Sequence, residues 1–233
     1  MKIRSLLLAG IAAGLSSIAS AAVMTFDIAP GSELDNLPVS ASATFTTSAD
    51  TLTIQLTNLQ ANPTSVIQLI SDILFTFSND VTGDSTLTSS TATEITIDSN
   101  GNATTGGTVA TGWGLEDASA PTLHLTVLGF AGPEHLVIGP GPYTNANGSI
   151  AGNQPHNPFL MSSPTFVLTN DSITVDTLIT AMSFSFGTTG GRDVPGVPTT
   201  PDQPVPEPGT LLLLSLGLAG LGFACRRNGV SRA

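Results

Sequence analysis

Three histidines, His124, His135 and His156, are the side chains best suited to bind a metal or to transfer protons near neutral pH. They stand 11 and 21 residues apart, and no cluster of cysteines or carboxylates accompanies them. The closely spaced ligand pairs typical of zinc sites are therefore absent from the sequence. His124 alternates with apolar neighbours, as on the polar face of a strand, and His156 stands in a stretch typical of a loop. We predict surface histidines, no metal site and no cofactor.

A second candidate for cation binding is the stretch of residues 98–102, where side-chain oxygens recur at short intervals. A calcium loop also needs a later glutamate as a bidentate ligand, and this sequence lacks it. Asn100 and Gly101 instead favour a tight hairpin turn, because such turns require positive φ. Glu116 and Asp117 are interpreted as a solvated acidic turn.

The sequence offers no clear set of catalytic residues. Serine is so abundant that none can be singled out as a nucleophile, and the Gly-x-Ser-x-Gly motif is absent. Two carboxylates for glycoside hydrolysis can always be drawn from 17 acidic residues, so such a pair carries no information. The one cysteine, Cys225, lies in the C-terminal tail, which excludes a catalytic thiol from the body of the chain. We expect a protein that is not an enzyme, and a secreted hydrolase is the least favoured alternative.

Two aromatic residues could contact a ligand. Trp113 and Tyr143 are the only residues of their kinds, and either ring could stack on a sugar. Tyr143 and His156 fall in residues 139–163, which are rich in Gly, Pro and Asn and are predicted to form a long loop. A tryptophan in a β-sandwich is more often part of the core, so this contact set supports only the alternative function of a carbohydrate-binding module or adhesin.

Between residues 23 and 191 the apolar residues alternate with polar ones, most often threonine, as expected for strands with one buried face. This period of two recurs in residues 43–46, 52–57, 94–97, 123–127, 166–169, 173–175 and 182–186. About eight to ten strands with one buried face indicate an all-β fold, an antiparallel β-sandwich whose jelly-roll-like or Ig-like topology stays open. Residues 65–74 fit a short helix as well as a buried strand, and we assign strand only from Asp72 to Ser78.

The N-terminus has the layout of a secretory signal peptide over residues 1–22. Lys2 and Arg4 precede an apolar run, and small residues follow it. Ala19 and Ala21 suit recognition by signal peptidase, so cleavage after Ala21 or Ala22 is expected. An uncleaved anchor is the alternative, but the apolar run is shorter than the roughly 20 residues that a spanning helix needs.

The C-terminus changes composition abruptly after a linker of Pro, Thr and Gly over residues 192–204. Residues 211–225 are apolar or small apart from Ser215, and a transmembrane helix is predicted over residues 210–225. Its length of roughly 24 Å, at about 1.5 Å per residue, is slightly short for a bilayer core. Arg226 and Arg227 follow the span and favour the cytoplasmic side, which places the body of the chain outside.

Charge supports the same topology. Five of the six basic residues lie near the two ends, so the body of the chain, residues 23–204, retains only Arg192 beside 16 of the 17 acidic residues, for a net charge of −15. A body this acidic should repel nucleic acid and anionic lipid.

Residues 205–233 resemble the PEP-CTERM sorting signal of exopolysaccharide-producing bacteria. The resemblance rests on Pro206, Glu207 and Pro208, then a Leu- and Gly-rich span, then Arg226 and Arg227. It implies that exosortase, an integral-membrane protease, recognises the three motif residues and removes the span. The implied product is a cell-surface or extracellular-matrix protein, anchored in the inner membrane before processing and associated with exopolysaccharide or biofilm. A permanent single-span anchor is the alternative.

Overall fold

Strands make up almost all the regular structure in the computed structural model, which describes residues 21–78 and 81–199. One short 3₁₀ helix, η1 (Val66–Gln68), is present among them. The strands are β1 (Ala22–Ile28), β2 (Glu33–Leu34), β3 (Leu37–Pro38), β4 (Ala41–Ser48), β5 (Thr51–Asn58), β6 (Ile70–Phe77), β7 (Thr86–Ile97), β8 (Ala103–Ala110), β9 (Gly114–Asp117), β10 (Thr122–Thr126), β11 (Val137–Ile138), β12 (Phe159–Met161), β13 (Thr165–Thr169), β14 (Ile179–Phe186) and β15 (Asp193–Thr199).

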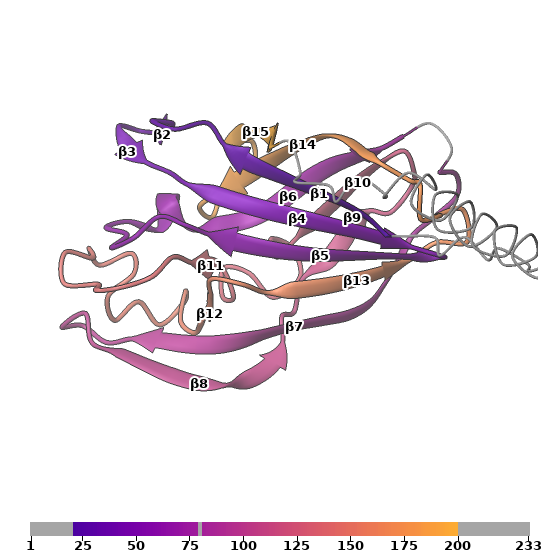
Figure 1. The fold of residues 1–233 in the computed structure, drawn as a ribbon. Helices are drawn as coiled ribbons and strands as arrows, with labels where there is room; N and C mark the ends of the chain where they lie inside the picture. The colour runs from indigo at the N-terminus through magenta and orange to yellow at the C-terminus, as the bar shows by residue number, and fades with distance from the viewer. Residues whose placement is uncertain (1–20, 79–80, 200–233) are drawn as a thin grey trace, which may run out of the picture. The chain divides into compact units, whose positions relative to one another are not determined.

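The first layer consists of antiparallel strands in the order β7-β13-β5-β4-β1, and β8 extends it beyond β7 (Figure 1). The alternation of apolar and polar residues gives this layer one buried face and one exposed face. In β4 and β5 every second side chain is buried, and the alternate positions carry Ser, Thr and Gln. Threonine suits such half-exposed positions because its branched side chain packs well on a pleated surface.

The second layer has the order β15-β14-β6-β10-β9 and is also antiparallel. Two connections join it to the first layer. On one side β15 stands between β14 and β1, and on the other the short strands β11 and β12 link β6 to β7. The all-β prediction is confirmed, and the arrangement is sandwich-like.

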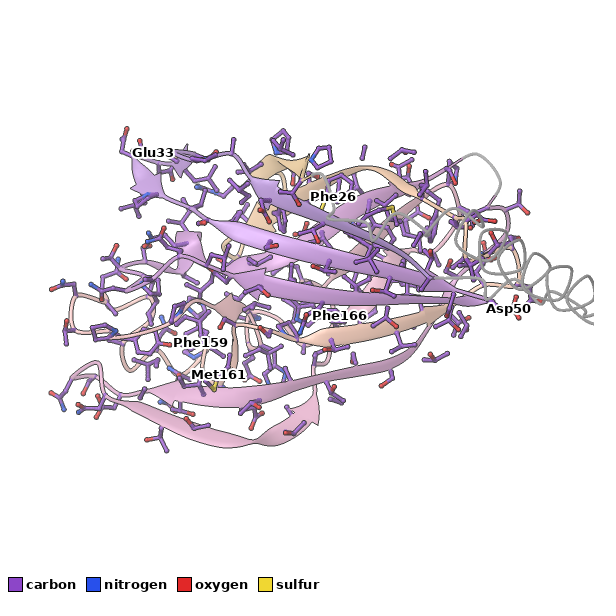
Figure 2. The ribbon with its side chains drawn as sticks, viewed as in Figure 1. Phe26, Glu33, Asp50, Phe159, Met161 and Phe166 are labelled. Carbon is purple, nitrogen blue, oxygen red and sulfur yellow. The ribbon has the colours of Figure 1, made fainter. Side chains whose placement is uncertain are left out.

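Aromatic side chains fill the space between the layers. The rings of Phe45 on β4 and Phe75 on β6 lie 5.3 Å apart, and Phe26 on β1 meets Phe45 edge to face at 5.8 Å. Both Phe45 and Phe75 are fully buried, and each contributes about 1.5–3 kcal/mol by leaving water. Farther along, Phe166 on β13, labelled in Figure 2, lies in the same interior. Its ring packs against Trp113, which comes just before β9.

Three sequence predictions need correction. Residues 173–175 form no strand, because the Ile173 N–H is donated to the Asn170 carbonyl within a turn. The Ile173 side chain is buried there, so the sequence has the same apolar–polar alternation as a strand. Within residues 192–204, predicted to be a linker, Asp193–Thr199 forms β15 and pairs with β14 through Pro195 and its neighbours. The loop predicted over residues 139–163 is interrupted by β12.

The ambiguous stretch of residues 65–74 contains both predicted structures, because η1 is followed directly by β6 from Ile70. Over residues 21–78 and 81–199, no helix has the length and apolar character needed to cross a membrane. The predicted span of residues 210–225 lies outside the described residues, as does the signal peptide up to residue 20.

Candidate functional site

A groove of about 550 Å³ lies beside the turn that joins β7 to β8. Two chain segments form its walls: the turn itself, with Gly101 and Asn102, and the segment after β11, with Pro140 and Pro142. Met161 at the end of β12 also lines the groove and is 38% exposed, which gives the groove an accessible apolar contact.

Glycine is required where the two walls meet. Gly101 has φ of +79°, and a Cβ atom there would lie 2.5 Å from the carbonyl oxygen of Tyr143. Gly139 is restricted by space alone, since its Cβ would lie 2.0 Å from the carbonyl oxygen of Gln60, behind the groove lining. The groove is therefore built by close backbone contacts, for which a side chain leaves no room.

Of the three predicted ligand contacts, only Tyr143 lines this groove. Its side chain is nevertheless buried, and its hydroxyl donates a hydrogen bond of 2.9 Å to the Gly139 carbonyl. Burial raises the pKa of the Tyr143 phenol. The hydrogen bond holds the proline-rich segment in place, so the described geometry gives Tyr143 a structural role.

Trp113 and His156 lie away from the groove lining. Trp113 is 5% exposed, its ring contacts Phe166, and its Nε1–H is donated to the His135 carbonyl at 3.0 Å. This is the core placement that burial tendency favours. The Nδ1 atom of His156 lies 2.6 Å from the Ser149 carbonyl oxygen, which holds the ring within its own loop.

His124 is held between two carboxylates on the outer side of the second layer. Its Nε2 atom lies 3.3 Å from Oδ1 of Asp72 on β6, and its Nδ1 atom lies 2.9 Å from Oε2 of Glu116 on β9. The hydrogen bond that His124 donates to Asp72 raises the pKa of His124 most; burial opposes this, and the charges of Asp72, Glu116 and Asp193 add to the rise. The arrangement stabilises a charged imidazolium.

His135 also has a carboxylate partner. Its Nε2 atom lies 3.0 Å from Oε1 of Glu94 on β7, and its Nδ1 atom lies 2.8 Å from the Thr111 carbonyl oxygen. The ring therefore ties the segment before β11 to the end of the β7–β8 hairpin.

Residues 98–102 form the hairpin turn that Asn100 and Gly101 predict. Asp98 Oδ1 accepts the backbone N–H groups of Asn100 and Asn102, and Oδ2 accepts the Asn102 side-chain amide. These hydrogen bonds, first that of the Asn102 side chain, lower the pKa of Asp98. Both carboxylate oxygens of Asp98 therefore accept hydrogen bonds that stabilise the turn. In the part of the chain that the structure describes, no group of three or more His, Cys, Asp or Glu side chains is arranged to hold a metal.

Sequence reasoning missed the acidic partners Asp72, Glu94 and Glu116 of the two histidines. The residues stand 52, 41 and 8 positions from their partners. Only the register of β6 with β10, the pairing of β12 with β11 and β7, and the pairing of β9 with β10 bring them together. The one available signal was Asp72, a charge within a run of otherwise uncharged strand residues.

The predicted sorting and processing residues fall almost entirely outside the described residues. This applies to Ala19, to the motif residues Pro206, Glu207 and Pro208, and to Arg226 and Arg227. Ala21 is described and is exposed, directly before β1.

Comparison with known proteins identifies one feature of the chain. Residues 204–227 match the family model described as the PEP-CTERM protein-sorting motif. No curated protein and no solved structure matches the chain. The chain therefore carries a PEP-CTERM sorting motif at the residues from which the sequence predicted it, and the motif implies exosortase as its processing partner.

Proposed function

We propose that this chain is an exported cell-surface or extracellular-matrix protein whose β-domain is the cargo of exosortase-dependent sorting. The observation that carries the proposal is the order of the chain: the last strand, β15, ends at Thr199, and the PEP-CTERM motif begins at residue 204. The folded part thus ends just before the processing signal, so removal of the signal leaves every described strand intact.

Charge supports an external role for the domain. Residues 23–204 carry 16 acidic residues and only Arg192 as a base, and Arg192 itself is paired with Asp35 at 2.7 Å. Such a surface repels the anionic inner membrane once the span is removed, which favours release toward the outside. We propose exopolysaccharide or a biofilm matrix as the destination, with signal peptidase acting at the N-terminus.

The hydrogen-bond partners of His124 and His135 support a non-catalytic role. In both His124 and His135 each ring nitrogen is engaged, by two carboxylates in the first and by a carboxylate and a carbonyl in the second. A histidine that acts as a base needs a free nitrogen facing a substrate. Turnover by the purified protein on a panel of glycan, peptide and ester substrates would contradict this part of the proposal.

Fractionation of the producing bacterium tests the destination. Immunoblots of the cytoplasm, inner membrane, cell surface, extracellular matrix and medium should find the mature protein in the surface or matrix fraction. The same blots on a strain without exosortase are expected to show it retained in the inner membrane. Equal distribution in both strains would contradict the proposal.

The groove beside the β7–β8 turn favours a second candidate, binding of a carbohydrate by the domain. Because Trp113 is buried, substitution there would damage the core, and Met161 is the better probe. Met161→Lys places a charge in the groove, and Leu178→Lys is the matched control because Leu178 is also an exposed apolar residue and does not line the groove. Loss of polysaccharide retention with Met161→Lys alone supports binding, and equal retention of all three proteins rules out the groove.

A further inference from the structure

β8 is an edge strand that projects from the first layer. Within the described residues it pairs only with β7, and the side of β8 away from β7 has no neighbouring strand (Figure 1). Seven of its eight residues are exposed, so both faces of the strand are open as well. A strand in this position presents unpaired backbone N–H and C=O groups, which form a template for another strand.

Natural edge strands are usually protected by charges, proline or short length, and β8 has none of these. Its sequence from Ala103 to Ala110 holds only Ala, Thr, Gly and Val. The other edge differs: β9 has four residues, and two of them are Glu116 and Asp117.

One irregularity interrupts β8. The register with β7 shifts between Thr93 and Ile95, which leaves Gly106 and Gly107 opposite Glu94 as a bulge. A Cβ at Gly107 would meet nothing within 4 Å, so the face of the strand is open at the bulge. Segments of regular pairing remain on both sides of it, at Ala103–Thr105 and Thr108–Ala110.

We propose that β8 is a dimerisation edge, which pairs in antiparallel orientation with β8 of a second copy of this chain. An antiparallel pair of identical strands is symmetric about a two-fold axis, so one interface satisfies both edges and closes the assembly. The short, acidic β9 at the opposite edge of the fold does not propagate the contact, and a dimer results instead of a fibre.

Charge restricts where two copies of the chain can meet. Two copies with net negative bodies repel each other over most of their surfaces, and the uncharged β8 is where two backbones can approach. The inference uses the proposed function in one respect: sorting to a single surface would concentrate copies of the chain there. Pairing itself is a property of the folded domain and is measured without reference to location.

Sedimentation velocity of the exported protein across a range of concentrations tests the proposal. We expect a monomer–dimer equilibrium that shifts toward dimer at higher salt, because salt screens the repulsion between the bodies. The substitutions Thr105→Lys and Thr108→Lys, introduced together, should weaken dimerisation about tenfold, since like charges placed across paired strands destabilise them. Both changes lower the net negative charge, so charge alone would predict the opposite result.

Gln55→Lys is the matched control. Gln55 is exposed on β5, which has paired strands on both sides, so this change alters charge without touching an edge. We expect it to preserve or strengthen the dimer. Circular dichroism checks that all variants are folded.

Single cysteines locate the contact. Cys225 is the only cysteine of the chain, so in a Cys225→Ser background an engineered thiol is unique. Cysteines placed one at a time along β8 should form disulfide-linked dimers near the two-fold axis, and Gln55→Cys should not. A monomer at all concentrations, a dimer unaffected by the two lysines, or binding of foreign extended peptides by a monomeric protein would each overturn the proposal.

Discussion

The Nε2 atom of His124 lies 3.3 Å from Oδ1 of Asp72, and Asp72 is only 4% exposed although it stands on the outer side of its layer. A nearly buried carboxylate is stable only when a partner compensates its charge. His124 supplies that partner from β10, and Glu116 on β9 holds the other ring nitrogen. The three side chains thus link β6, β10 and the edge strand β9.

This cluster predicts a pH dependence of stability. Because the folded-state pKa of His124 is raised, protonation favours the folded protein, and the stabilisation is fully present below the unfolded pKa of about 6.5. It is lost as pH rises through the raised pKa. The difference in melting temperature between wild type and His124→Gln should therefore be largest in mildly acidic buffer and shrink in alkaline buffer. A difference that is constant with pH would contradict the assignment.

Asn58 predicts a large loss of stability on substitution. It is fully buried on β5, where its Nδ2 donates to the carbonyls of Gln68 and Val137 at 2.8 and 2.9 Å, and its Oδ1 accepts the Gln60 N–H. Asn58→Ala leaves these groups without partners and should cost about 2–4 kcal/mol in the free energy of unfolding. Urea denaturation measures it. The exposed Asn102→Ala is the control, and a loss no larger than that of the control would contradict the prediction.

Strands with one buried and one exposed face can be predicted from the sequence, and strands with two exposed faces cannot. In β4 and β5 buried and exposed residues alternate strictly because one face of each strand packs on the core, so the sequence pattern predicts both strands. β8 is exposed on both faces and has no apolar period, and Pro195 in β15 suggested a linker because proline is rare inside sheets. β8 forms because it pairs with β7, and β15 forms because it pairs with β14. The residues of these two strands do not by themselves predict such pairing.

The same distinction applies to the sites. The sorting motif is a contiguous stretch and is readable from the sequence alone. The His124 and His135 clusters join residues from different strands, and single-sequence reasoning cannot supply the register that brings them together. Trp113 was predicted to be more often core than contact, and the structure places it in the core.

The first residue of the mature chain is a further prediction. The sequence allows cleavage after Ala21 or Ala22, but Ala22 is buried at the start of β1, and its backbone nitrogen donates to the Val175 carbonyl at 3.2 Å. Cleavage after Ala21 preserves this contact, so the mature protein should begin with Ala22. The only lysine is Lys2, so amine labelling marks the new N-terminus selectively for mass spectrometry. A mature chain that begins with Val23 would contradict the prediction.

Replacement of Pro206, Glu207 and Pro208 with alanine tests the sorting account most directly. Exosortase is expected to recognise these three residues, which fall within the matched motif. The exported variant should therefore keep its apolar tail and remain in the inner-membrane fraction at a larger mass than the wild-type protein, as measured by fractionation and intact-mass spectrometry. A variant with the same mass and the same location as the wild type would contradict the account.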